Sequence, residues 1–248
     1  MKNEIETNIK HLKRMARFYI HTGKIISAIY KMENIMENLS FNKQDKEDML
    51  NNLLKNWGEQ TLKDIEFEVH IDNGIYNKNI KNAIFMANHN SNIDTLVLLA
   101  TSPKPIRMIA KKILFKIPFF GKAMTHTGFF EIDRKNHSNS LKILNNISRK
   151  LNIENRSVLS FPEGSRSRTG KLQEFKKGVF HLSITSQVPI IPITILNTQK
   201  VNGIGDWRIK DGKIIIYYHK PIFTKNLTTK DIPELITKVR KSIESKLI

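Results

Sequence analysis

One His and one Asp stand close together where a buried strand is expected to turn into a helix. The apolar run Ile84–Ala87 is followed by a polar turn that holds His89 and, five positions later, Asp94. A loop of this kind often carries the chemistry of an α/β protein. A His can take a proton from a hydroxyl group when a second group fixes its tautomer and stabilises the imidazolium. Asp94 can do this by accepting a hydrogen bond from the other ring nitrogen. Taken alone, the pair is more often a helix cap and a structural turn residue.

Charged residues follow two further expected strands. Asp133 and Arg134 come after one of them, and Glu163 and Arg166 come after another. The carboxyl ends of strands in an open α/β sheet face a common crevice, so we expect these residues to meet His89 there. Arginine binds phosphate oxygens in a bidentate manner. A crevice with a base and two arginines suits proton abstraction from a substrate that carries a phosphate.

Several other kinds of site are not supported. The stretch from Gly164 to Lys171 looks like a nucleotide-binding loop, but it has five residues between its glycines, and Leu172 stands where Ser or Thr would bind magnesium. There is no Gly-x-Ser-x-Gly elbow, so a serine hydrolase is not indicated. The chain has no Cys, and its other His residues show no ligand spacing, so we expect no metal site.

Two amphipathic helices are expected before the catalytic segments, over about residues 8–39 and 43–63. The first helix has apolar residues at alternating steps of three and four, namely Met15, Phe18, Ile25, Ile29, Met32, Met36 and Leu39. Leu12, Tyr19 and Ile26 widen this stripe. The opposite face is basic, with Lys10, Lys13, Arg14, Arg17, Lys24 and Lys31. Residues 1–63 therefore form a helical hairpin, which packs on the main domain or lies as an anchor at a membrane interface. The two interpretations are compatible.

The rest of the chain, residues 64–248, reads as one α/β domain. Strands are expected at 65–71, 80–86, 106–110, 128–134, 157–161, 190–196 and 213–219, and helices at 138–151, 175–186 and 229–247. The basic and apolar segment 111–121 breaks at Pro118. This alternation predicts a mixed-sheet α/β sandwich preceded by the helical hairpin.

The composition indicates an anionic partner. The chain has 41 basic and 23 acidic residues and a formal net charge of +18, which suits nucleic acid, an anionic membrane leaflet or a phosphorylated substrate. No apolar run approaches the roughly 18–20 residues needed to cross a bilayer. Lys13, Arg14, Arg17 and Lys24 interrupt any signal sequence. We expect a protein of the cytoplasm or of the cytoplasmic face of a membrane.

Four ordered segments resemble the blocks of the glycerolipid acyltransferases, and most of all the bacterial 1-acyl-glycerol-3-phosphate acyltransferases. They are Asn88-His89-x4-Asp94, Gly128-x3-Ile132-Asp133-Arg134, Phe161–Ser167 and Val188–Pro192. The segments 110–121 and 172–178 are also similar, and the likeness runs from about Ile65 to the C-terminus. Four blocks in order are specific for this family, whereas one alone would be a weak signal.

The resemblance implies roles for individual residues. His89 would be the general base and Asp94 its partner, while Arg134, Glu163 and Arg166 would bind the glycerol-phosphate of the acceptor. Gly164 would allow a close backbone approach, and Lys111 would be a further phosphate contact. The block with Val188, Pro189 and Pro192 would line the path of the acyl donor, although a plain core strand fits it as well. Glu131 departs from the family, which usually has an apolar residue there.

The implied reaction transfers a fatty acyl group from acyl-CoA or acyl carrier protein to the free hydroxyl of lysophosphatidic acid. It needs no covalent acyl-enzyme, no metal and no other cofactor. The resemblance also implies association with an anionic membrane surface at the cytoplasmic face of the cell membrane, without a spanning helix.

Three alternatives remain open. A sister enzyme would use glycerol-3-phosphate or a lysophospholipid as the acceptor. A basic nucleic-acid-binding protein would fit the charge, but there is no recognised binding motif, and the aromatic residues do not alternate with basic ones as in a stacking platform. An inactive membrane-binding relative is disfavoured because His89, Asp94 and Glu163 are all present.

Overall fold

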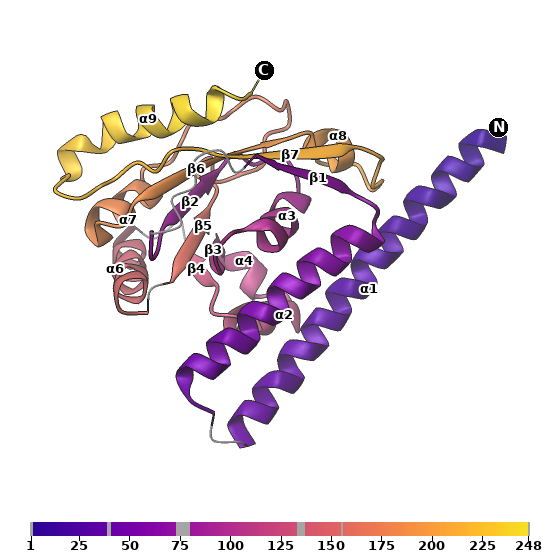
Figure 1. Ribbon diagram of the computed structural model, residues 1–248, viewed down its shortest axis with the longest axis horizontal. Helices are drawn as coiled ribbons and strands as arrows, with labels where there is room; N and C mark the ends of the chain where they lie inside the picture. The colour runs from indigo at the N-terminus through magenta and orange to yellow at the C-terminus, as the bar shows by residue number, and fades with distance from the viewer. Residues whose placement is uncertain (1, 39–40, 73–79, 133–136, 155, 248) are drawn as a thin grey trace.

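A mixed sheet forms the centre of the protein. The computed structural model describes residues 2–38, 41–72, 80–132, 137–154 and 156–247. The sheet order in these residues is β1-β7-β6-β2-β5-β3-β4 (Figure 1). Its strands are β1 (Glu68–Asp72), β2 (Ile84–Ala87), β3 (Ile106–Lys111), β4 (Phe130–Ile132), β5 (Ser157–Ser160), β6 (Ile190–Leu196) and β7 (Lys213–Tyr218). The strands from β6 to β4 are parallel, while β7 is antiparallel to β6 and pairs in parallel with β1. The carboxyl ends of the parallel strands therefore lie at one edge.

Helices cover both faces of the sheet. They are α1 (Lys2–Asn38), α2 (Lys43–Asp64), α3 (Ile93–Thr101), α4 (Lys112–Phe115), α5 (Phe120–His126), α6 (His137–Ile153), α7 (Gly178–Ser186), α8 (Thr198–Asn202) and α9 (Ile232–Glu244), the last preceded by a 3₁₀ turn at Thr229–Asp231. The predicted mixed-sheet α/β sandwich with its N-terminal helical hairpin is confirmed. No helix in the described ranges has both the length and the apolar character that a membrane crossing requires.

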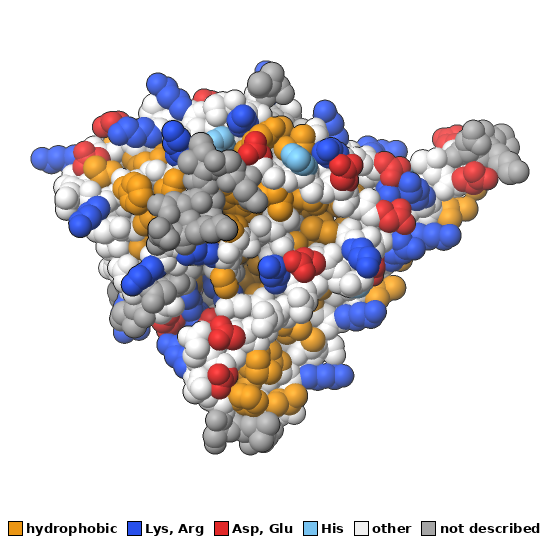
Figure 2. Space-filling model, in the orientation of Figure 1, with side chains coloured by type: hydrophobic (Ala, Val, Ile, Leu, Met, Phe, Trp, Pro, Cys, Tyr) orange, Lys and Arg blue, Asp and Glu red, His pale blue; other side chains and the backbone are white. Residues whose placement is uncertain are grey.

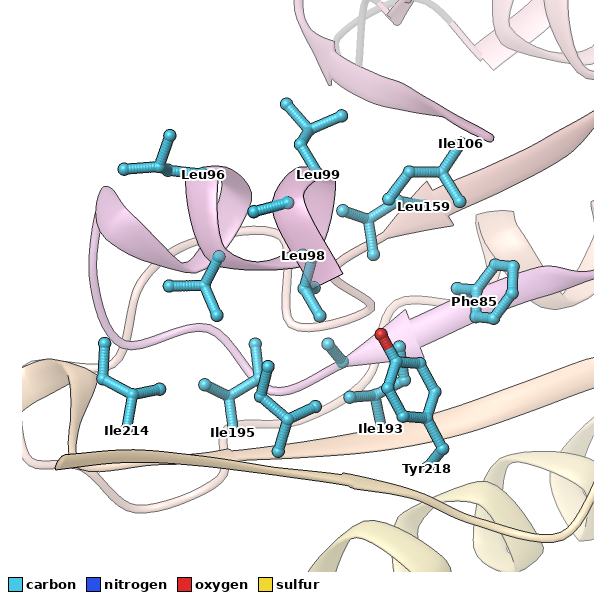
Figure 3. Close-up of a cluster of buried hydrophobic side chains, with 14 of the residues drawn as sticks. Phe85, Leu96, Leu98, Leu99, Ile106, Leu159, Ile193, Ile195, Ile214 and Tyr218 are labelled. Carbon is cyan, nitrogen blue, oxygen red and sulfur yellow. The ribbon is translucent and has the colours of Figure 1, made fainter. Parts of the chain in front are cut away.

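The alternation of side chains along β2 divides the core into two layers. Phe85 and Ala87 face the layer that contains α3, whereas Ile84 and Met86 face α6, α7 and α9. Figure 3 shows the first layer, where Leu98 of α3 lies over Ile193 and Ile195 of β6. All four residues of β2 are buried, as expected of a central parallel strand. The loop after β2 therefore starts from a rigid point.

The hairpin packs on the α/β part through the predicted apolar stripe of α1. Ile25 and Ile29 are buried with Ala123 of α5, while Met32 and Met36 are buried with Leu50 and Leu54 of α2, inside the hairpin. Helix α2 approaches α3 closely, since a Cβ at Gly58 would lie 2.9 Å from that of Ala100. The N-terminal end of α1 extends beyond the rest of the molecule (Figure 1). The division into domains at residues 63 and 64 stays a prediction.

Several local expectations were wrong. The strands expected at 80–86 and 128–134 begin only at Ile84 and Phe130, and the helix expected at 175–186 begins at Gly178. Two further differences have a clear physical reason. The predicted strand 65–71 begins only at Glu68, because α2 continues to Asp64 and the Ile65 N–H closes its last turn onto the carbonyl of Thr61. Arg14, expected on the basic solvent face of α1, is 2% exposed and pairs with Glu66 and Asp211. Both acids lie far along the sequence, so helical periodicity alone gives no sign of them.

Candidate active site

His89 lies in the loop that follows β2, and Asp94 lies in the first turn of α3. Nδ1 of His89 is 2.8 Å from Oδ2 of Asp94. The same Oδ2 accepts the backbone N–H groups of Asn90 and Ser91 at 2.7 and 2.8 Å. Asp94 is fully buried, whereas the His89 side chain is 18% exposed. A carboxylate that accepts three hydrogen bonds places the ring proton on Nδ1, which leaves Nε2 of His89 as the basic atom.

The backbone of His89 is held by the loop that follows β5. Its N–H donates to Oε1 of Glu163 at 2.7 Å, and its carbonyl accepts the N–H of Ser167 at 2.7 Å. The ring of Phe161 stacks on the imidazole, with 3.9 Å between ring centroids. The loop with the conspicuous arginines therefore also fixes the position of the base.

Glu163 is buried between two loops. Its Oε2 accepts the N–H of Gln173 at 2.9 Å, so each carboxylate oxygen accepts one backbone hydrogen bond. Burial raises the pKa of the Glu163 carboxyl, while the hydrogen bonds from Gln173 and His89 oppose this change. In this arrangement Glu163 joins the His89 loop to residues 163–173.

A polar cavity lies beside this loop. It has a volume of about 490 Å³ and is lined by Lys111, Ser165, Arg166, Ser167, Arg168, Thr169, Gln173 and Ile204. Gly164 has φ +77°, a backbone conformation that glycine adopts readily, and it turns the chain into this loop. Three basic side chains around one open cavity form a suitable site for a phosphate group.

A second cavity is apolar and has a volume of about 510 Å³. Asn92 and Thr95 at the start of α3 line it, together with apolar residues of α1, α2, α3, β3, α4 and α5, such as Ile26, Trp57, Leu96 and Met108. Asp94 lies between Asn92 and Thr95 in the chain, so the His89–Asp94 pair sits at the same helix start. The site thus combines a base, a basic cavity and an apolar cavity.

Comparison of the chain with known proteins identifies its family. The acyltransferase family model matches residues 66–196, more than half of the chain. A 1-acyl-sn-glycerol-3-phosphate acyltransferase of Haemophilus influenzae is 32% identical over 171 residues, which are 68% of this chain and 70% of that one. The chain belongs to the acyltransferase family.

A plant protein and a solved structure are also similar to this chain. A 1-acyl-sn-glycerol-3-phosphate acyltransferase of Cocos nucifera is 33% identical over 142 residues, covering 57% of this chain and 46% of that one. The crystal structure of a 1-acyl-sn-glycerophosphate acyltransferase from Thermotoga maritima has the same fold, with a TM-score of 0.81, 97% of this chain and 96% of that chain covered, and 23% identity.

The structure of the acyltransferase brings most of the predicted site residues to one edge of the sheet. His89, Asp94, Glu163, Gly164 and Arg166 follow β2 and β5, and Lys111 ends β3. Arg134, expected beside them, lies outside the described residues. Glu131, the departure from the family pattern, is half-exposed and 4.0 Å from Lys112. The catalytic and binding roles of these residues stay predictions.

The block with Val188, Pro189 and Pro192 has a different position in the acyltransferase. Val188 is buried in the core layer beneath α7 and α9, and Pro192 pairs with Met86 within the sheet. None of these three residues lines either of the cavities described above. Their place along the donor path stays a prediction, and the core-strand alternative fits the positions of Val188 and Pro192.

Several hydrogen bonds that support the site were not predicted. Asn88 and Ile195 exchange two hydrogen bonds, of 2.9 and 2.7 Å, that fix the end of β2 to β6. Ser91 donates to the carbonyl of Asn202 in α8, and Gln199 of α8 donates to that of Arg168 at 2.8 Å. Helix α8 thus contacts both the base loop and the arginine loop. Only the position of Asn88 and Ser91 around His89 hinted at such roles in the sequence.

Proposed function

We propose that this acyltransferase transfers a fatty acyl group from a thioester to the free hydroxyl of 1-acyl-glycerol-3-phosphate, giving phosphatidic acid. The observation that carries the proposal is the position of the hydrogen-bonded residues His89 and Asp94 beside a cavity lined by cationic side chains and an apolar cavity. The names of the relatives point to the same acceptor.

The proposed reaction is a direct transfer. Nε2 of His89 takes the proton of the acceptor hydroxyl while its oxygen attacks the thioester carbonyl carbon. Asp94 supports the imidazolium through Nδ1. The carbon–sulfur bond breaks, the thiolate takes the proton from His89, and the enzyme returns to its starting state without a covalent acyl-enzyme.

The two cavities supply the positioning. Arg166 and Lys111, which line the polar cavity, hold the phosphate of the acceptor, and the apolar cavity holds a fatty acyl chain. The family resemblance adds Arg134 as a further phosphate contact. Orientation of this kind can contribute several kcal/mol, and up to about 7–11 kcal/mol in the best cases. The donor is acyl-CoA or acyl carrier protein, and no further cofactor takes part. Within the described residues, no three His, Asp or Glu side chains are grouped as metal ligands.

The membrane is where a lysophospholipid acceptor resides, and we place the enzyme on its cytoplasmic face. Ile5, Ile9, Leu12, Tyr19 and Ile20 of α1 are exposed, and α1 carries Lys13, Lys24 and Lys31 beside them. This is the composition of an interfacial helix. Much of the predicted core stripe packs inward, and Leu12 and Tyr19, two of the residues expected to widen it, lie on the exposed side, whereas Ile26 lines the apolar cavity.

The test is acyl transfer by the purified protein with labelled palmitoyl-CoA. Lysophosphatidic acid is compared with glycerol-3-phosphate and lysophosphatidylcholine as acceptors. We expect phosphatidic acid from lysophosphatidic acid alone, a loss in His89→Ala of about 10²-fold or more, and a higher KM for the phospho-acceptor in Arg166→Ala. Transfer to glycerol-3-phosphate instead would show the sister activity. If palmitoyl-CoA gives no transfer, the assay is repeated with palmitoyl-acyl carrier protein, and no transfer with both donors would reject the proposed function.

A further inference from the structure

The segment between β3 and α5 carries an apolar patch, of which only Ile117 also lines a cavity of the site. Ile113, Ile117 and Phe119 are 63%, 44% and 73% exposed. Exposed large apolar side chains that stand together on a monomer mark an interaction surface more often than single ones do. Exposed lysines flank them at Lys111, Lys116 and Lys122. The patch thus has the composition of an interfacial segment.

The backbone holds this patch as a protruding turn. Phe119 has φ +61°, a conformation that bulky side chains rarely adopt. Gly121, two residues further on, lies against the carbonyl of Phe115. Any side chain at Gly121 would therefore collide with the backbone of Phe115. Backbone strain of this kind is often found at functional sites. The strained backbone at Phe119 therefore suggests that its exposed ring has a function.

The turn continues the exposed side of α1. Ile5, Ile9, Leu12 and Tyr19 are separated by four, three and seven residues, and Tyr30 lies eleven residues further on, close to whole turns of a helix. These residues therefore lie along one line of α1. Tyr30 donates to the carbonyl of Phe119 at 3.2 Å, so the turn stands at the end of this line.

The turn also lies between the two cavities of the site. Leu114, Ile117 and Phe120 line the apolar cavity, and Lys111, just before the turn, lines the polar cavity. Ile113 and Phe119 line neither of them. If this turn binds to a lipid leaflet, both cavities lie next to that leaflet.

We infer that residues 113–119 are a second lipid-docking surface, which together with α1 seats the enzyme on an anionic bilayer leaflet. Ile113 and Phe119 enter the interface, and Lys116 and Lys122 contact the anionic headgroups. The purpose of this docking rests on the proposed function. Contact through both α1 and residues 113–119 would hold the cavities against the membrane in which the acceptor lies.

The full-length protein is tested for sedimentation with vesicles of phosphatidylcholine and phosphatidylglycerol, and with vesicles of phosphatidylcholine alone. The variants are Phe119→Glu and Ile113→Glu. Phe223→Glu is the matched control, because Phe223 has the same 63% exposure as Ile113 and lies outside the turn. We expect about tenfold weaker binding of the two variants to the anionic vesicles, little change for the control, and weak binding of all proteins to the neutral vesicles.

Turnover is measured in parallel with a short-chain acceptor dissolved as monomers and with a long-chain acceptor embedded in vesicles. Retained turnover on the dissolved acceptor, with loss on the embedded one, supports docking and shows that the variants fold. Unchanged vesicle binding of both variants, or an equal loss in Phe223→Glu, overturns the inference. Self-association of the wild type that both variants abolish would assign the patch to a second copy of the chain. Vesicle binding needs no turnover, so an inactive wild type would reject the proposed function alone.

Discussion

At the scale of single residues, the site depends on how firmly the His89 loop is held. Asp94 fixes the ring, and Glu163 and Ser167 bind the two backbone groups of His89. Glu163 carries two competing interpretations, since the family resemblance implies contact with the acceptor, whereas both of its oxygens accept backbone hydrogen bonds. These interpretations predict different kinetics.

The variant Glu163→Gln separates the two roles. A Gln side chain has one acceptor oxygen and one NH₂ group, so the N–H of His89 or of Gln173 loses its partner. We expect kcat to fall about tenfold or more with little change in the KM of the acceptor, because the base is displaced. Steady-state kinetics with Glu174→Gln, an exposed neighbouring acid, provides the control. A raised acceptor KM with an unchanged kcat would instead assign Glu163 to substrate binding.

At the scale of elements, buried charges join the hairpin to the sheet. Glu47 of α2 pairs with Arg107 of β3 at 3.0 Å and with Arg156 before β5. The Arg107 side chain is only 3% exposed, and burial lowers its pKa while Glu47 opposes this change. Gly128 lies against Arg156, because a Cβ there would be 3.0 Å from Nη1 of that guanidinium. This family-block glycine thus makes room for the ion-pair network.

Removing the shared acid should therefore destabilise the fold. For Glu47→Gln we expect a loss of about 3–5 kcal/mol in the free energy of unfolding, because the buried Arg107 is left without its counter-charge. Urea denaturation measures it, with Glu59→Gln as the control, since Glu59 and Lys55 form an exposed pair on the same helix. The control should change by no more than about 1 kcal/mol. Equal small effects of both variants would show that the network contributes little.

The outcome for the elements shows what a sequence can predict. Strands such as β6 and helices such as α2 follow from local periodicity, and their bounds were nearly correct. Sheet order and the burial of Arg14 and Arg107 depend on partners tens to hundreds of positions away. The same holds for the support that α8 gives to the loops. His89 and Asp94 were found because both lie in one short loop, whereas the apolar cavity is assembled from six elements.

Helix α9 is joined to the sheet next to a partly buried His. Oγ1 of Thr194 in β6 donates to the carbonyl of Ile243 in α9 and lies 2.8 Å from Nε2 of His219. Burial, and to a smaller extent Lys246, lowers the pKa of His219, while Asp72 raises it. The unfolded chain therefore takes up this proton at a higher pH than the folded chain, so stability decreases as the pH falls below the usual His range.

The variant His219→Gln removes this contribution. Between about pH 7.5 and about pH 5, we expect the variant to lose less of its free energy of unfolding than the wild type does. Urea denaturation at several pH values measures the difference, and His70→Gln serves as the control because His70 is exposed. An identical pH dependence of the His219→Gln variant and the wild type would exclude His219 as the source.

At the scale of the whole molecule, the net charge of +18 allows two kinds of anionic partner. Figure 2 shows Lys and Arg spread over one face, with apolar side chains between them along α1. The affinity of a purely electrostatic contact, such as one with nucleic acid, falls steeply as the salt concentration rises. A lipid contact adds burial of apolar surface, which salt does not screen. The two partners therefore differ in their salt dependence.

A salt titration uses this difference. From about 0.05 M to about 0.5 M salt, we expect binding to duplex DNA to disappear, whereas binding to vesicles that contain phosphatidylglycerol should level off at a residual affinity. Fluorescence anisotropy of labelled DNA and vesicle sedimentation measure the two curves on the same protein. The residual vesicle affinity should be lower in Leu12→Glu, which places a charge on the exposed side of α1, where Leu12 is 61% exposed. DNA binding that persists at high salt, together with vesicle binding that vanishes, would favour the nucleic-acid alternative. In that case the positive charge would serve a specific polar contact, and the apolar side of α1 would have no lipid partner.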